Sequence, residues 1–513
     1  MLDIEGAPAG APSLAWHRLD YCAFHPWCYH KDAVTSQRRL CCIVLTAFLG
    51  HVLVATPHSF AQNRSTASSR DQELNSQFQT AVAQYDAGHF AEAAAQLEKL
   101  LHEVPDSFEA QELLGMVYAG ESQDALAKQH LEVAVRLNPT SAAARTNLAA
   151  NLIRLGDVEA ARQQLKKAVA LAPRSYDANH NLGEIYVKLG KLPDAIPFLK
   201  QAQQINPSSY DNGYDLALAY LLTDHSDPAR QLVHALLKRQ DTAELHNLLG
   251  QIEEKEGNFV AAANEFETAA HQDPSESNLF DWASELLLHR TLEPAIDVFR
   301  NATERFPASA RLAIGLGIAY YSRGIYDEAV KSLLRAADLN PSDPRCYLFL
   351  SKAYDSSPSQ ADEVIQRFRR FSELQPNDAR AQYYYAISLW KGKRAQDPAV
   401  DFTQIETLLR KAIALDPKLS EAHFQLGNLL SDQTRYADAI PEYLMALDSD
   451  SKIPDAHYRL GQAYVHTGQK DKAQVQLALY QEQRAQHLAD LDKQRAEIRQ
   501  FVYSEENRTS AKQ

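Results

Sequence analysis

The 513-residue sequence has few cysteines, no excess of basic charge and almost no long apolar run. Four of its five cysteines lie before residue 61, and Cys346 alone can form no internal disulfide, so most of the chain depends on packing. The formal net charge is −14 at pH 7. This charge argues against a general nucleic-acid-binding protein, because such a protein needs a basic stripe to neutralise phosphates.

The sequence also lacks the motifs by which catalytic sites are recognised. It has no phosphate-binding loop, no nucleophile elbow and no pair of histidines at metal-binding spacing on one helix. Cys22, His25, Cys28 and His30 are residue types that bind zinc, but four ligands within nine residues leave little chain to surround a tetrahedral ion. We therefore expect no enzyme activity, no metal and no cofactor.

One apolar run stands near the N-terminus. Arg38 and Arg39 precede the sixteen residues LCCIVLTAFLGHVLVA, and small residues follow at Ser59 and Ala61. This layout is typical of a secretory signal peptide, and the run is short for a membrane-spanning helix, which needs roughly twenty apolar residues. We predict cleavage after Ala61 and export to the periplasm or the cell exterior. Retention of the run as a membrane anchor is the alternative.

The rest of the chain repeats a pattern about every 34 residues. A column of prolines marks the period, a second column holds alanines, and a third alternates glycine with other small residues. The prolines are Pro105, Pro139, Pro173, Pro207, Pro274, Pro307, Pro341, Pro376 and Pro417, with Asp241 in the missing place. The third column begins Gly115, Ala149, Gly183, Ala217, Gly250, Ala283 and Gly317. Columns kept in step predict one repeated unit rather than several unrelated domains.

Each unit contains two apolar-periodic stretches separated by a turn. Leu182, Ile185 and Leu189 recur at helical spacing in one unit, and Ala195 and Leu199 do so after the turn. The turn often holds glycine, which accepts the left-handed backbone that a helix end needs. The proline ends the second helix because it disfavours helix in the residue before it. Each unit is therefore predicted to be a helical hairpin whose small residues let the two helices cross closely.

These residues resemble the tetratricopeptide repeat (TPR), which has leucine, a small residue and tyrosine in its first helix and alanine, leucine, alanine and proline in its second. The matching residues of one unit are Leu182, Gly183, Tyr186, Ala195, Leu199, Ala202 and Pro207. The resemblance implies an all-α, right-handed superhelical solenoid of about twelve helical hairpins with a C-terminal capping helix. It also implies a non-enzymatic scaffold for protein-protein interaction.

The repeat sets the expected organisation of the chain. We expect an N-terminal extension and signal peptide over residues 1–61, a flexible linker over 62–73, the solenoid over 74–483, and a capping helix with a disordered tail over 484–513. The unit after Ala379 carries extra residues near KGKRAQDPAV, which predict a longer loop between its helices. Cys346 lies among apolar residues and is interpreted as a buried small side chain rather than a reactive thiol.

In TPR solenoids the first helices line a concave groove, so the resemblance implies that residues beside the buried leucine-glycine pair contact partners. The predicted groove residues are Asn147, His180, Asn181, Tyr214, Asp215, Asn247, Phe280 and Asp281, followed in later units by Tyr383, Tyr384, Phe424, Gln425 and Tyr458. Amides bond to an extended peptide backbone, and aromatic rings give a large contact area. We expect a protein or peptide partner, no nucleic acid, and membrane contact only through the signal or a retained anchor.

Several alternatives stay open. The predicted groove residues can be interpreted equally well as ordinary solvated side chains without a binding role. A clamp of lysine, arginine and asparagine, by which some TPR proteins hold a terminal carboxylate, is represented only by Arg154 and Lys188. By resemblance to exported bacterial TPR proteins, the chain is expected to join envelope or secretion complexes. It is otherwise a membrane-tethered adaptor, or an accessory that presents a substrate to a separately encoded enzyme.

Overall fold

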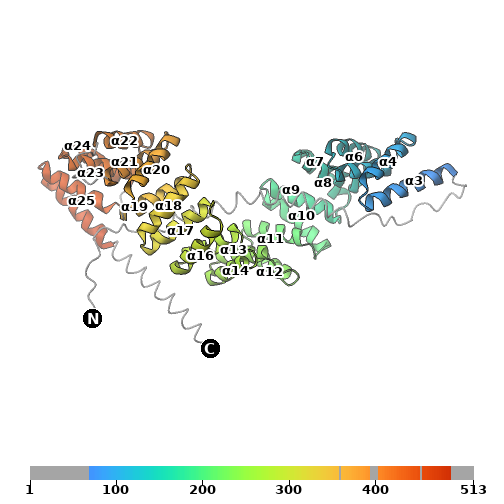
Figure 1. The fold of residues 1–513 in the computed structure, drawn as a ribbon, viewed down its shortest axis with the longest axis horizontal. Coiled ribbons are helices and arrows are strands. Elements are labelled where there is room, and N and C mark those ends of the chain that lie inside the picture. The colour runs from blue at the N-terminus through green and yellow to red at the C-terminus, as the bar shows by residue number, and fades with distance from the viewer. Residues whose placement is uncertain (1–68, 357–359, 393–401, 451–452, 487–513) are drawn as a thin grey trace, which may run out of the picture. The chain divides into compact units, whose positions relative to one another are not determined.

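The computed structural model describes residues 69–356, 360–392, 402–450 and 453–486. Within these ranges the chain forms 24 helices packed as paired hairpins (Figure 1), which confirms the all-α TPR solenoid fold. The chain divides into two compact units between Pro274 and Ser275, and each is described separately. The predicted signal peptide with its cleavage after Ala61, the cysteines and histidines before it, and the loop residues 393–401 lie outside the described residues.

The N-terminal unit contains six hairpins. Its helices are α3 (Ser69–Asp86), α4 (Phe90–Glu103), α5 (Phe108–Gly120), α6 (Asp124–Leu137), α7 (Ala142–Arg154), α8 (Val158–Leu171), α9 (Tyr176–Lys188), α10 (Leu192–Ile205), α11 (Tyr210–Leu222), α12 (Ser226–Leu237), α13 (Ala243–Lys255) and α14 (Phe259–Gln272). Because α3 begins at Ser69, residues 69–73 are helical, whereas the sequence predicted a flexible linker there.

The C-terminal unit continues the same plan. Its helices are α15 (Glu276–Leu288), α16 (Leu292–Arg305), α17 (Ala310–Arg323), α18 (Tyr326–Leu339), α19 (Pro344–Ser356), α20 (Ala361–Leu374), α21 (Ala379–Gly392), α22 (Phe402–Leu415), α23 (Ser420–Asp432), α24 (Tyr436–Ser449) and α25 (Pro454–His466). A final helical segment over 470–486 packs after α25 and runs past residue 483, where the solenoid was expected to end. The tail predicted beyond it lies outside the described residues.

The column of small residues marks where the two helices of a hairpin approach most closely. A Cβ atom built at Gly183 would lie 2.5 Å from Leu199 Cδ2, and one built at Gly317 would lie 2.5 Å from Leu333 Cγ. Real Cβ atoms do not come this close to another carbon, so a side chain here would push the second helix away. The packing reason given for this column is therefore confirmed.

Most of the described hairpin turns contain one residue with a left-handed backbone, directly before the N-cap of the second helix. Glycine supplies it at Gly88, Gly156, Gly190, Gly257, Gly324 and Gly468. Four other hairpins use larger residues with φ near +60° in the same place, namely Ser122, Asp224, Arg290 and Thr434. These four hairpins therefore keep the same turn, at the steric cost that a Cβ atom brings in this conformation.

A side-chain cap fixes the start of many of the first helices. In five units a serine stands two residues after the proline, and its Oγ accepts a hydrogen bond from the backbone nitrogen three residues later; these serines are Ser107, Ser141, Ser175, Ser209 and Ser309. Such N-caps satisfy one of the free amide groups of the first turn. Proline and serine together therefore stop one hairpin and begin the next within three residues.

In six units a polar side chain six residues after the proline ties the new unit back to the one before it. Gln111 donates to the Pro105 carbonyl oxygen at 2.9 Å, and Asn179 donates to that of Pro173 at 3.0 Å. The other members of this set, which we call back-bonding residues, are Arg145, Tyr347, Gln382 and His423. Sequence reasoning missed them because their residue types differ from unit to unit.

Candidate functional site

The first helices of successive hairpins touch one another and form a continuous row. In the N-terminal unit the contacting pairs are α3 with α5, α5 with α7, α7 with α9, α9 with α11, and α11 with α13. In the C-terminal unit α15, α17, α19 and α21 form a similar row, and α23 contacts α25. We call the surface that these helices present in each unit the first-helix face. Most predicted groove residues are half-buried side chains on these helices.

Some of the predicted groove asparagines are already hydrogen-bonded within the chain and are therefore less able to bond to a ligand. Asn147 donates to Glu112 Oε1 at 3.0 Å, and burial raises the pKa of Glu112 although this hydrogen bond opposes the shift. Asn247 accepts a hydrogen bond from Gln251 at 2.7 Å. Asn181 is half-buried and makes no side-chain hydrogen bond within the described part of the chain. Asn181 is therefore the amide best placed to bond to a ligand.

His180 lies beneath the surface rather than in the groove. Its side chain is 8% exposed, and Nδ1 lies 3.1 Å from Oδ1 of Asn212, which is fully buried. The Asn212 amide in turn donates to the Leu199 carbonyl oxygen and to Gln203. His180 thus connects α9 to α11, which corrects its assignment as a residue that points at a partner. Tyr384 is similarly buried, at 6% exposed.

Stacked aromatic rings line the first-helix face of the N-terminal unit. The rings of Tyr176 and His180 stack at 5.5 Å with an interplanar angle of 10°, and those of Tyr210 and Tyr214 stack at 6.4 Å and 17°. Tyr176 and Tyr210 each follow an N-capping serine directly. This Ser-Tyr pair recurs in the sequence, but the predicted groove residues did not include either tyrosine. The predicted residue Tyr214 is thus one member of an ordered aromatic pair.

Two of the predicted groove residues of the C-terminal unit, Phe280 and Asp281, lie on α15. Phe280 is half-buried, meets the Phe299 ring edge-on at 6.0 Å, and lies under the Arg311 guanidinium at 4.8 Å. Arg311 also pairs with Glu276 at 2.9 Å. Asp281 is half-buried and has interactions of its own. One face of Phe280 is therefore already covered by a cation from its own chain.

Arg154, one of the two clamp candidates, has a structural role. Its Nη1 donates to the Ala119 carbonyl oxygen at 2.7 Å, and the guanidinium pairs with Asp124. Lys255 does the same farther along, bonding to the Leu221 carbonyl oxygen and pairing with Asp224, each at 2.6 Å. These cations satisfy the free carbonyl groups at a helix C-terminus. Lys188 makes no such contact among the described residues, so it remains exposed to a ligand.

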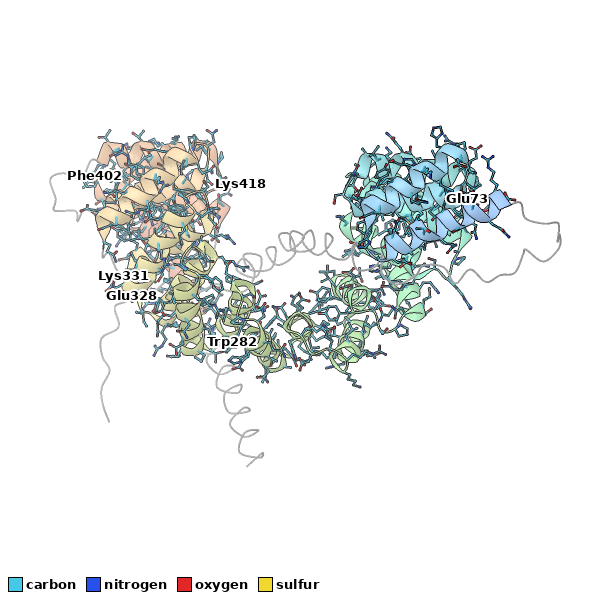
Figure 2. The ribbon with its side chains drawn as sticks, turned by 45° about the vertical axis from the view of Figure 1, so that its right-hand side comes forward. Glu73, Trp282, Glu328, Lys331, Phe402 and Lys418 are labelled. Carbon is cyan, nitrogen blue, oxygen red and sulfur yellow. The ribbon has the colours of Figure 1, made fainter. Side chains whose placement is uncertain are left out.

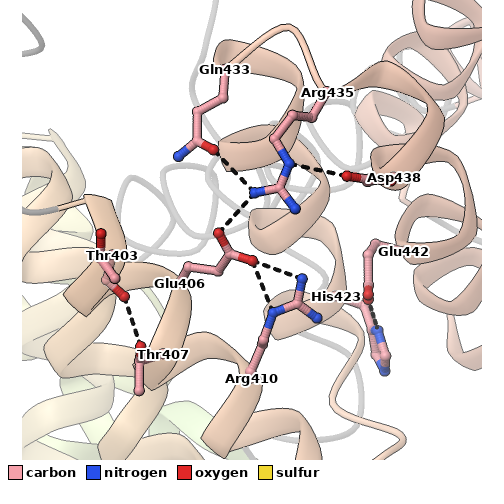
Figure 3. Close-up of polar contacts among 9 residues, drawn as sticks. All are labelled: Thr403, Glu406, Thr407, Arg410, His423, Gln433, Arg435, Asp438 and Glu442. Carbon is pink, nitrogen blue, oxygen red and sulfur yellow. Dashed lines mark hydrogen bonds and ion pairs between the residues drawn. The ribbon is translucent and has the colours of Figure 1, made fainter.

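The second helices carry charges that pair with one another. Glu406 of α22 bonds to Arg410 on its own helix and to Arg435 of the next hairpin, the latter at 3.0 Å (Figure 3). Asp338 pairs with Arg367 in the same way at 3.0 Å. Exposed pairs within one helix, such as Glu328 and Lys331 on α18 at 2.6 Å, add little stability (Figure 2). These charges of the C-terminal unit are thus satisfied within the chain.

His423 lies between two hydrogen-bond acceptors. Its Nδ1 lies 2.7 Å from Glu442 Oε2 (Figure 3), and its Nε2 lies 3.1 Å from the Pro417 carbonyl oxygen. A carboxylate and a carbonyl oxygen both accept hydrogen bonds, so this arrangement favours the ring form in which both nitrogens donate. The hydrogen bond to Glu442 is the main cause that raises the pKa of His423, while burial of the ring opposes it. His246 is similarly placed between Glu265 at 2.5 Å and Asp241 at 2.8 Å.

The stability of the C-terminal unit is therefore expected to depend on pH through His423. Because its folded pKa lies above the ordinary value of 6.5, this stabilisation is complete below that pH and is lost as pH rises through the raised pKa. The variant His423→Gln should abolish this dependence and keep the bond to Pro417, since Gln111 and Gln382 serve at the equivalent place. Urea unfolding between pH 6 and 9 measures the difference, and identical pH dependence in both proteins would contradict the assignment.

The described residues show no inorganic site. They contain no group of three or more His, Cys, Asp or Glu side chains able to hold a metal ion. In the same ranges, no helix is long and apolar enough to cross a membrane. Cys346 is fully buried, its thiol donates to the Asp343 carbonyl oxygen at 3.0 Å, and burial raises its pKa. Its interpretation as a buried small side chain is confirmed.

Comparison with curated proteins finds partial matches to a longer protein. Residues of this chain are 23% identical over 204 residues to Protein O-mannosyl-transferase TMTC3 of Homo sapiens, and 24% identical over 196 residues to the same protein of Mus musculus. These alignments cover 38% and 36% of this chain. The chain spans only about a fifth of the length of either relative.

Several solved structures are also similar. Naa15/Naa10 bound to HypK-THB matches 79% of this chain and 68% of its own at 16% identity and a TM-score of 0.35. Pseudomonas aeruginosa pilF matches 41% of this chain and 96% of its own at 20% identity and a TM-score of 0.37. YrrB, described as a TPR protein with an unusual peptide-binding site, matches 36% of this chain and 95% of its own at 18% identity and a TM-score of 0.31.

Family models give the most direct assignment. One model described as tetratricopeptide repeat matches residues 78–142, 146–210, 280–344 and 406–487, and a second with the same description matches residues 186–252. The matched segments together cover more than half of the chain and fall in both compact units. They include most of the small-residue and proline columns described above, and Pro274 and Pro376 lie between them. The chain therefore belongs to the tetratricopeptide repeat family and is a protein-interaction scaffold of that class.

Proposed function

We propose that this protein holds an extended polypeptide segment along the first-helix face of its N-terminal unit. The observation that carries the proposal is a pair of unengaged polar side chains on one first helix. Asn181 and Lys188 on α9 have no hydrogen-bond or ion-pair partner for their side chains within the described residues. An amide that can donate and accept suits the backbone of an extended chain, which offers both groups at regular intervals.

Selection of random twelve-residue peptides against the purified full chain tests this proposal. A selected peptide is expected to bind at least tenfold more weakly to the double variant Asn181→Ala/Lys188→Ala, because both contacts are lost. The matched control is Gln163→Ala/Lys167→Ala, which removes the same two side-chain types from the exposed face of the second helix α8. Both variants should keep helical content and melting temperature, since solvent-facing changes usually alter stability by less than about 0.5 kcal/mol. Equal weakening by both variants would contradict the proposal.

We further propose that the protein is exported by cleavage after Ala61 and acts outside the cytoplasm, in a bacterial envelope or secretion complex. The support is the arrangement of Arg38 and Arg39, the apolar run and the small residues Ser59 and Ala61. Mass spectrometry of the protein from its native host should find a mature N-terminus at Gln62. A mass that retains the apolar run would instead favour the membrane-tethered adaptor.

A further inference from the structure

Three successive first helices of the N-terminal unit carry a carboxylate at the same place. Asp177, Asp211 and Glu244 are each the second residue of their helix, in α9, α11 and α13. A negative charge in the first turn stabilises a helix through the helix dipole. The row of carboxylates alone therefore does not indicate a binding site.

The aromatic pairs beside these carboxylates are fixed in position by the neighbouring repeat. The hydroxyl of Tyr176 lies 2.6 Å from Ser209 Oγ, and that of Tyr210 lies 2.8 Å from Thr242 Oγ1 and donates to Glu244 at 2.9 Å. Each tyrosine thus bonds across to the following hairpin while its ring stacks on a residue of its own helix. Rings held in this way present a surface whose conformational entropy is already lost before a ligand binds.

A further carboxylate stands beside these rings. Asp215 lies one turn after Asp211 on α11 and is half-buried. Burial raises the pKa of Tyr176, and the charges of Asp211, Asp177 and Asp215 raise it further, so all three carboxylates act at this ring.

From these contacts we infer that the first-helix face of α9, α11 and α13 binds a cationic extended segment rich in arginine or lysine. Guanidinium groups stack on aromatic faces and pair with carboxylates, so Tyr176, Tyr214 and Asp211 together suit arginine. Asp177 and Asp211 have no ion-pair partner among the described residues, and the incoming cations supply one. This inference rests on the proposed function and names the chemistry of its partner.

The spacing of the repeats sets the spacing of the cations. Neighbouring packed helices lie about 8–10 Å apart, and an extended chain rises about 3.3 Å per residue. Successive carboxylates of the row therefore face every third residue of a segment that crosses the helices. A segment with arginine at every third position is expected to bind better than one in which the same arginines are adjacent.

Fluorescence anisotropy with a labelled twelve-residue peptide of four Arg-Ser-Gly repeats tests this inference on the full chain in 150 mM NaCl. The variant Asp177→Asn/Asp211→Asn is expected to bind this peptide at least tenfold more weakly than the original protein. The control Glu92→Gln/Glu132→Gln removes the same charge from exposed positions of the second helices α4 and α6 and should change binding less than twofold. The corresponding Glu-Ser-Gly peptide should not bind.

Equal weakening by the two variants would overturn the inference, because it would mean only a general attraction to an acidic chain. If a peptide with four adjacent arginines binds as well as the Arg-Ser-Gly peptide, the proposed spacing of one cation every third residue would be wrong. The random-peptide selection separates this inference from the proposed function. Selected peptides that depend on Asn181 and Lys188 but lack arginine and lysine would refute the cationic partner and leave the groove function intact, whereas the absence of any groove-dependent peptide would contradict both.

Discussion

Replacing Gly183 by leucine is expected to lower the free energy of unfolding around α9 and α10 by about 3 kcal/mol or more. A Cβ atom at this position would already lie 2.5 Å from Leu199 Cδ2 and 3.2 Å from the Leu199 backbone nitrogen, so the helices must separate to admit a larger side chain. Because each repeat of a solenoid contacts only its neighbours, the damage should be local. Hydrogen exchange measured by mass spectrometry should show lost protection in these two helices.

The control for this variant is Lys188→Leu on the same helix. Lys188 is exposed and its side chain makes no hydrogen bond or ion pair among the described residues, so the same leucine there should change stability by less than about 0.5 kcal/mol. Similar loss of protection in both variants would show that leucine disturbs α9 for a reason other than close helix packing. That result would contradict the explanation given for the column of small residues.

Replacing Tyr347 by alanine is expected to destabilise the C-terminal unit by about 3–5 kcal/mol. The Tyr347 side chain is fully buried, its ring stacks on Phe371 with centroids 4.0 Å apart, and its hydroxyl donates to the Pro341 carbonyl oxygen at 3.0 Å. The alanine variant therefore leaves a cavity between α19 and α20 and also loses the bond to the preceding unit. Thermal unfolding and hydrogen exchange in α19 and α20 measure the loss.

The variant Tyr347→Phe separates these two contributions. It keeps the stacked ring and removes only the hydroxyl, so the expected loss is about 1 kcal/mol. An effect as large as that of alanine would mean that the hydroxyl bond, rather than ring packing, holds the hairpin together. A negligible effect of alanine would contradict the buried placement of the ring.

The fold could be predicted because its causes recur at a fixed spacing. Pro173 ends one hairpin, Ser175 caps the next helix and Gly183 admits Leu199, and each of these effects acts within a few residues or one hairpin. The turns at Ser122 and Arg290 were harder to recognise, because the left-handed backbone there is imposed by the surrounding hairpin and not by the residue type. The start of α3 before Leu74 was missed for a similar reason, since that helix lacks the flanking proline that marks later units.

The sequence could predict where the candidate site lies, but not which of its side chains are already hydrogen-bonded within the chain. The period placed Asn147, His180 and Asn181 on first helices, but it did not show which side chains are already bonded. Glu112 lies 35 residues before Asn147 and Asn212 lies 32 residues after His180, so these partners become visible only when hairpins are stacked. The sequence offered Arg154 only as part of an incomplete clamp, and the structure shows that it bonds to the Ala119 carbonyl oxygen. The unengaged residues therefore define a smaller surface than the pattern suggested.

Site-specific photo-crosslinking tests the central claim, that the first-helix face of the N-terminal unit is the binding surface, most directly. A photoreactive phenylalanine is introduced at Asn181 on α9 in one full-length protein and at Lys167 on α8 in another, and each is irradiated with the same selected peptide. The account predicts a crosslinked product from the position of Asn181 and none from that of Lys167. A crosslink only from Lys167 would place the binding surface on the second helices and contradict the account.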